Sequence, residues 1–133
     1  MASRLRRLLA EETGSSPVEF VLVGALLTLL TLGVLQLGLA IYVRNVVHDA
    51  AVEGAYHGAL ADTGAAEGIV RTREIITRAI GSDYASDVRA RVVGPREHQS
   101  IEVTVHATLP LIGLLGAPNA WEVTARAPVE TLD

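Results

Sequence analysis

Hydrophobic and polar positions form three successive patterns along the chain, of which the first is an uninterrupted apolar run. Residues 20–43 carry no charged side chain. As a helix they would be about 36 Å long at 1.5 Å per residue, whereas the hydrocarbon core of a bilayer is roughly 30 Å thick. The alternative is a buried helix of a soluble core, but such helices are rarely apolar on all sides over this length. The first pattern therefore predicts a membrane-spanning helix.

The second pattern is a helical spacing that continues beyond the apolar run. Residues 45–62 contain no proline and no paired glycine, so we expect the first helix to extend past the membrane. Ala50, Gly54 and Gly58 recur every four residues and give this helix a side without bulk, which permits close helix packing. A frayed helix is the alternative, since each glycine costs about 1 kcal/mol of helix propensity relative to alanine. A second helix is predicted over residues 65–80.

The third pattern is the alternation of apolar and polar residues that is typical of half-buried strands. The alternating stretches are residues 88–92, 101–109 and 121–126. They predict three antiparallel strands, of which the first two are joined by a turn with Gly94 and Pro95. The apolar connection at residues 110–119 has two prolines and two glycines, and we expect it to be a short helical or looped segment.

The predicted fold class is therefore α+β. A long N-terminal transmembrane helix extends into a small extracytoplasmic domain, which contains a second helix and a three-stranded antiparallel sheet. Arginines on the two sides of the apolar run predict that the N-terminus lies in the cytoplasm, because cytoplasmic flanks are enriched in basic residues. Arg4, Arg6 and Arg7 precede the run, whereas Arg44 alone follows it closely. A cleaved secretory signal is the alternative, but its apolar core would be only about 7–15 residues long.

Composition limits the chemistry that the chain can perform. The absence of cysteine excludes disulfides, thiolate zinc sites and thiol nucleophiles, and a net charge of −4 argues against a nucleic-acid partner. The histidines His48, His57, His98 and His106 form no ligand cluster in the sequence. Asp49, Glu53 and His57 are spaced four apart, which a solvated helix stripe explains better than a metal site. No nucleophile-elbow, zinc-protease or P-loop motif is present. We expect no metal, no cofactor and no enzymatic activity.

The segment before the apolar run, GSSPVEF at residues 14–20, is the most informative motif. A carboxylate at the mouth of an apolar helix is costly unless it is neutralised or lies among lipid headgroups. Cleavage after Gly14 would create an amine at Ser15, about one helical turn from Glu19, and the two charges would compensate each other within one chain or between neighbours. The alternative is an ordinary helix start, with Ser15 or Ser16 as N-cap and Glu19 as the capping-box carboxylate.

This segment resembles the class III leader of type IV prepilins. Such a leader is short and charged and ends in glycine, and it is followed by glutamate at the fifth position after the glycine, an aromatic residue and an apolar helix. The sequences SPVEFVLV, YVRNVVHDAAVEGAYHGA and LPLIGLLG, together with the alternating strands, extend the resemblance. Over nearly its full length the chain resembles a TadE-like minor pilin, or pseudopilin, of the tight adherence (Tad, Flp) system.

The resemblance implies that a prepilin peptidase cleaves between Gly14 and Ser15 on the cytoplasmic side. It also implies that Glu19 pairs with the amine of a neighbouring subunit during assembly, with Phe20 at the adjoining aromatic position. The implied partners are this peptidase, other Tad pilins or pseudopilins, the Tad inner-membrane assembly platform and the lipid bilayer. The implied segments are a cytoplasmic leader (1–14), a transmembrane helix (15–43) and an extracytoplasmic domain (44–133).

In this interpretation the subunit is stored in the bacterial inner membrane and enters a surface pilus, where it acts in biogenesis, adhesion or secretion. The alternative is an uncleaved single-pass protein that scaffolds a secretion or surface complex.

Overall fold

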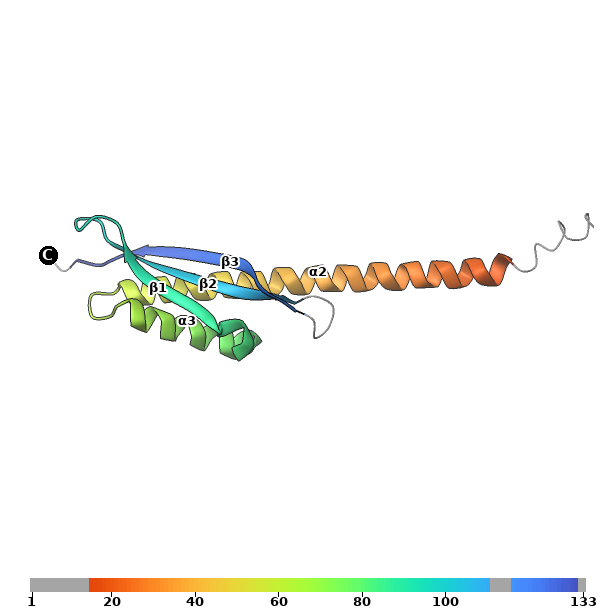
Figure 1. Ribbon diagram of the computed structural model, residues 1–133, viewed down its shortest axis with the longest axis horizontal. Helices are drawn as coiled ribbons and strands as arrows, with labels where there is room; N and C mark the ends of the chain where they lie inside the picture. Colours follow the sequence, from red (N-terminus) through yellow and green to blue (C-terminus); the bar gives the residue numbers. More distant parts are fainter. Residues whose placement is uncertain (1–14, 111–115, 132–133) are drawn as a thin grey trace, which may run out of the picture. The chain divides into compact units, whose positions relative to one another are not determined.

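The computed structural model describes residues 15–110 and 116–131, which form two long helices, a short 3₁₀ helix and one sheet (Figure 1). In chain order the elements are α2 (Ser15–Ala59), α3 (Ala65–Ile80), η2 (Ser82–Ala85), β1 (Asp87–Val93), β2 (Ser100–Pro110) and β3 (Gly116–Pro128). Helix α2 contributes to both of the compact units of the chain, residues 1–35 and residues 36–133. The predicted α+β class, with a long apolar first helix, a second helix and a three-stranded antiparallel sheet, is confirmed.

Helix α2 is continuous over 45 residues because its only proline, Pro17, lies in the first turn, where proline is tolerated. It ends three residues earlier than predicted, at Ala59. The hydroxyl of Thr63 donates to the carbonyls of His57 and Leu60, which the end of the helix leaves without helical partners. Helix α3 has the predicted bounds and ends before Gly81, whose φ of 106° favours glycine.

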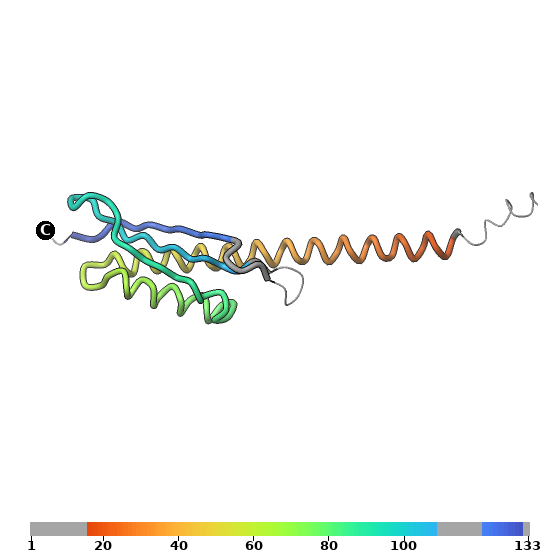
Figure 2. The backbone as a smooth tube through the Cα atoms, viewed as in Figure 1, coloured from red at the N-terminus to blue at the C-terminus, as the bar shows by residue number. Residues whose placement is uncertain are grey.

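Strand β2 is the central strand of the sheet, with β1 and β3 antiparallel to it on either side. The predicted turn between β1 and β2 requires glycine at Gly94, which has a φ of 95°. A Cβ atom at this position would lie 2.5 Å from the carbonyl oxygen of His98. At the same end of the sheet, the N–H of Val129 donates to the carbonyl of Gln99 at 2.9 Å. Figure 2 shows this hairpin and the end of β3 together.

The core of the second unit lies between one face of the sheet and the two helices that cover this face (Figure 1). Most of its side chains are alanine or valine, so the elements approach one another closely. The fully buried positions include Val43, Val47, Ala50, Ala51, Ala55, Ile76, Val103, Val105, Ala107 and Ala127. The core therefore begins at the residue where the exposed apolar part of α2 ends.

One expectation about the sheet was wrong. Strand β3 begins at Gly116, so residues 116–119 are not the predicted helical or looped segment; Pro110 pairs with Gly116. Proline is tolerated within β3 because β3 is an edge strand. Residues 111–115 of the same expected segment lie outside the described residues.

Candidate functional site

The apolar part of α2 is the most unusual surface among the described residues. Every large hydrophobic side chain from Phe20 to Tyr42 is exposed, Phe20 by 80%. The most apolar window of the helix has a mean hydropathy of 2.3, and none of it is buried. Monomeric soluble proteins rarely expose contiguous apolar patches of this size, so this surface requires lipid or other chains to cover it. The helix is long and apolar enough to cross a membrane, as a single-pass anchor would.

Two polar side chains within this segment are already satisfied. The hydroxyl of Thr28 donates to the carbonyl of Gly24, and that of Thr31 donates to the carbonyl of Leu27, both at 2.8 Å. A hydroxyl bonded to its own helix adds little cost in lipid, because it carries no unpaired donor into the hydrocarbon. These two threonines are therefore compatible with an apolar environment.

The predicted cleavage and assembly residues lie at the start of α2. Gly14 is outside the described residues, whereas Ser15 is the first residue of the helix and Glu19 and Phe20 follow in its second turn, both exposed. Ser15 and Glu19 are separated by about 6 Å along the helix axis. The first turn of α2 contains no acidic residue, so Glu19 is the first negative charge of the described chain. A carboxylate therefore lies one helical turn from the predicted new N-terminus.

The residues predicted for helix packing face the interior of the second unit. Ala50 is fully buried, and Gly54 and Gly58 are buried where α2 crosses α3. A Cβ atom at Gly54 would lie 1.8 Å from the Thr72 hydroxyl oxygen and 2.7 Å from the carbonyl oxygen of Gly68. At Gly58 it would lie 2.8 Å from the carbonyl oxygen of Gly64. The two helices are thus in backbone contact, which only glycine permits here.

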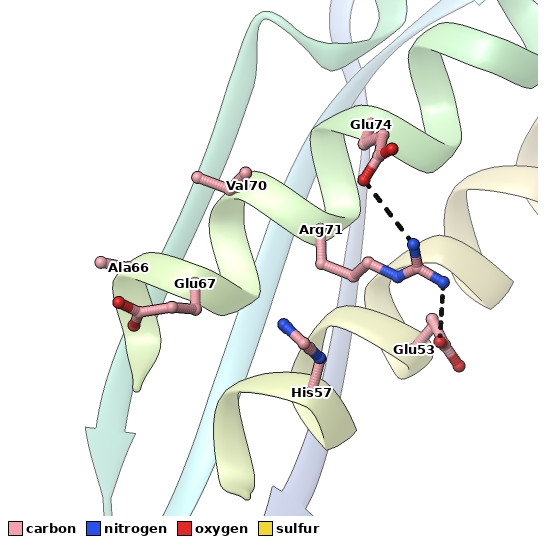
Figure 3. Close-up of a pocket in the computed structure, with 7 residues that line it drawn as sticks. All are labelled: Glu53, His57, Ala66, Glu67, Val70, Arg71 and Glu74. Atoms are coloured by element: carbon pink, nitrogen blue, oxygen red, sulfur yellow. Dashed lines mark hydrogen bonds and ion pairs between the residues drawn. The ribbon is translucent and has the colours of Figure 1, made fainter. Parts of the chain in front are cut away.

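A groove between α2 and α3 is lined by charged groups of both helices (Figure 3). Arg71 lies across it and makes ion pairs with Glu53 at 3.2 Å and Glu74 at 3.6 Å. His57 of α2 and Glu67 of α3 also line this groove (Figure 3). In the described part of the chain, no three histidine, cysteine or acidic side chains are arranged to hold a metal ion. The groove is therefore a contact between two helices that ion pairs stabilise.

The sheet face that points away from the helices carries a charged network that sequence reasoning missed. The carboxylate of Glu102 on β2 is only 2% exposed, because Arg91 on β1 and Arg126 on β3 cover it from both sides. Arg91 donates to one oxygen at 2.6 Å and Arg126 to the other at 2.5 Å. These hydrogen bonds hold the pKa of Glu102 below its usual value. The bond from Arg91 has the largest effect, followed by the bond from Arg126.

His106 lies four residues after Glu102 along β2, on the same face of the sheet. Its Nδ1 lies 3.3 Å from an oxygen of Asp87, and its Nε2 lies 3.7 Å from an oxygen of Glu122. Nδ1 is buried and has no hydrogen-bond partner among the described residues. The face therefore has carboxylates around a histidine at one end and arginines around a carboxylate at the other. The alternating sequence predicted a polar face, but these partners depend on the strand register.

Comparison with known proteins connects these features to one family. The family model for TadE-like proteins matches residues 14–55, which contain the start of α2, its whole apolar part and two of the three packing residues, Ala50 and Gly54. No match was found among curated proteins or among solved structures. A TadE-like match points to a Tad pilus system. Over residues 14–55 the chain matches the TadE-like family, and over these residues the resemblance seen in its sequence is confirmed.

Proposed function

We propose that this protein is a minor pilin or pseudopilin-like subunit of a Tad (Flp) pilus, with a structural and non-enzymatic role in biogenesis, adhesion or secretion. The observation that supports this proposal most directly is the exposed apolar part of α2, which follows Glu19 and lies within the TadE-like match. Such a helix is stable in lipid and equally stable against other apolar helices. One uncharged surface therefore serves as an inner-membrane anchor before assembly and as part of a helix bundle afterwards.

The leader and Glu19 would link these two states. A prepilin peptidase removes residues 1–14 on the cytoplasmic side and leaves an ammonium group at Ser15. In an apolar bundle the Glu19 carboxylate is costly without a positive partner, so it pairs with the Ser15 amine of a neighbouring subunit. The pair fixes the axial position of the incoming subunit. Its other partners are Tad pilins or pseudopilins and the inner-membrane assembly platform.

The proposal is tested by following the protein from the membrane to the cell surface. In cells with a complete Tad system, the wild-type chain should be found both in membranes and in filaments sheared from the surface. Glu19→Ala should remain in the membrane and be reduced at least tenfold in the sheared fraction. Glu97→Ala, which removes an exposed carboxylate from the β1–β2 hairpin, is the matched control and should behave as wild type. Unchanged incorporation of Glu19→Ala would exclude the pairing role.

A permanently anchored scaffold of a secretion or surface complex is the second candidate. It is favoured by the fact that the apolar part of α2 suffices as an anchor without any cleavage. In that case the wild-type chain stays wholly in the membrane fraction, even in cells that shed abundant filaments.

A further inference from the structure

The three-stranded sheet has two free edges, one on β1 and one on β3. Side chains at both edges are accessible: Arg89 of β1 is 71% exposed and Glu122 of β3 is 64% exposed. An edge strand presents a row of unpaired backbone N–H and C=O groups that can pair with another chain. Natural sheets often block such edges with lysine or a bulge. Proline also blocks edges, but residues 121–127 of β3 contain neither lysine nor proline, and the only register shift between β2 and β3 lies before them.

Two hydrogen bonds at the hairpin end establish which backbone groups point outward. The N–H of Val129 donates to Gln99, so odd-numbered residues of β3 bond to β2. The N–H of His98 donates to Pro95, so odd-numbered residues of β1 also bond to β2. Even-numbered residues therefore direct their N–H and C=O groups outward: Val88, Ala90 and Val92 on β1, and Glu122, Thr124 and Arg126 on β3. Within residues 15–110 and 116–131, no hydrogen bond reaches these groups.

Strands β1 and β3 run in the same direction, because each is antiparallel to β2. A second copy in the same orientation can therefore place its β1 beside β3 as a parallel strand. In a parallel pair, an outward residue bonds to the two residues that flank its neighbour. If Glu122 lies opposite Arg89 of the next copy, the backbone groups of Glu122 would form hydrogen bonds with those of Val88 and Ala90 of that copy. Both of these have outward groups, and the side chains of Glu122 and Arg89 would share one face of the extended sheet.

Direction also argues against a two-fold contact between two β3 edges. The N–H of Glu130, just after β3, donates to the carbonyl of Ala59 at the end of α2, at 2.8 Å. Residues 36–59 of α2 thus run in the direction of β3 (Figure 1). Antiparallel pairing of two β3 strands would reverse residues 36–59 of α2 in one copy, so the end of the apolar run, residues 36–43, would point in opposite directions in the two copies. Copies anchored in one membrane cannot pair in that way.

The charges on the open face select the register. At equal height, Glu122 would lie beside Asp87 of the next copy and Arg126 beside Arg91, so both pairs would repel each other. A shift of two residues, about 7 Å, removes both conflicts. Glu122 then lies beside Arg89, and Thr124 lies beside Arg91. Arg89 already extends into solvent with Asp87 as its described partner, so it can reach a second carboxylate.

We propose that the free edge of β3 binds the free edge of β1 in a second copy of this chain, with Glu122 opposite Arg89. The contact is heterologous, because the two surfaces differ, and it leaves one edge free on each terminal copy. Repetition therefore gives an open-ended row of subunits, each shifted axially from the last. This inference uses the membrane anchor of the proposed function but does not depend on cleavage of the leader.

Disulfide trapping tests the contact directly, because the natural chain has no cysteine. The double variant Glu122→Cys with Arg89→Cys is expressed as the full chain and oxidised in intact membranes. Neighbouring strands lie about 4.8 Å apart, which suits a disulfide between copies. Within one copy β2 separates the two positions by at least two strand spacings, roughly 9.5 Å, which is too far for a disulfide. The expected result is a ladder of dimers, trimers and larger species.

Single variants serve as matched controls and should remain monomeric, since neither position meets itself across a heterologous contact. Dimers of Glu122→Cys alone would indicate a two-fold β3 contact and overturn the proposal. Monomers of the double variant, with thiols that still react with a maleimide, would also overturn it. The pair Glu122→Cys with Asp87→Cys tests the unshifted register and should cross-link at least tenfold less. A peptidase-deficient strain, in which the leader is retained, should give the same ladder, because the contact does not depend on cleavage after Gly14.

Discussion

At the scale of single residues, Glu102 is the clearest example of a side chain whose environment is created by folding. It connects all three strands, because its two carboxylate oxygens accept hydrogen bonds from Arg91 on one side and Arg126 on the other. Charge-assisted hydrogen bonds are the stronger hydrogen bonds of proteins, and removal of the shared carboxylate leaves like charges beside each other. Replacing Glu102 would leave two arginines close together on the open face.

The stability of the domain should fall in acid partly because of this residue. The pKa of Glu102 in the folded protein is below its ordinary value of 4.5. Its stabilising contribution is therefore complete above pH 4.5 and is lost as the pH falls through the lower folded-state value. Glu102→Gln should lower the melting temperature at pH 7 and flatten its fall below pH 4.5. Thermal unfolding of the detergent-solubilised chain measures both effects.

Glu97→Gln is the matched control for this experiment, because its carboxylate is exposed on the β1–β2 hairpin and lies outside the Glu102 network. The control should retain the acid sensitivity of the wild type. An equally steep loss of stability below pH 4.5 in Glu102→Gln would show that other carboxylates account for the acid effect.

At the scale of secondary-structure elements, the crossing of α2 and α3 determines how closely the helical layer packs. The glycines of α2 meet the backbone of Gly64, just before α3, and of Gly68 within α3. The hydroxyl of Thr72 donates to the Gly68 carbonyl at 2.8 Å. This contact leaves no space for a methyl group. It also satisfies the hydroxyl of a fully buried threonine.

Gly54→Ala should therefore destabilise the domain. The added methyl gains about 1 kcal/mol of helix propensity, but overpacking at a close contact costs roughly 1–3 kcal/mol. Here the clash involves a backbone carbonyl as well as Thr72, so the helices must move apart and we expect a net loss. A lower melting temperature of the full chain in detergent is the measurement. Gly33→Ala is the control, because no atom lies within 4 Å of its added Cβ, and a loss of the same size there would refute the packing explanation.

Most elements could be predicted from the sequence because each has its own period. The apolar run and α3 follow from uncharged length and helical spacing, and the strands follow from alternation. The start of β3 could not be predicted, because Pro118 and the glycines at residues 113 and 116 favour a turn in isolation, whereas pairing with β2 extends the strand. The surroundings of Glu102 depend on register across three strands, which alternation alone leaves open.

At the scale of the whole molecule, the orientation in the membrane remains a prediction from the flanking arginines. Labelling of engineered cysteines in intact spheroplasts tests it without background, because the chain has none of its own. In a strain that lacks the prepilin peptidase and so retains the leader, a membrane-impermeant maleimide should react with Ser82→Cys, at an exposed position of η2, and should not react with Ser3→Cys in the leader. Both should react after the membrane is permeabilised. Labelling of the leader cysteine alone in intact spheroplasts would mean the reverse orientation.

The proposed function depends above all on the conversion of a stored membrane protein into a processed pilus subunit. The most direct measurement is the intact mass and N-terminal peptide of the protein purified from membranes and from sheared filaments. We predict that the processed species begins at Ser15, that it is the form in filaments, and that deletion of the prepilin peptidase restores the full 133-residue chain. A protein that retains residues 1–14 in cells with an active peptidase would contradict the account.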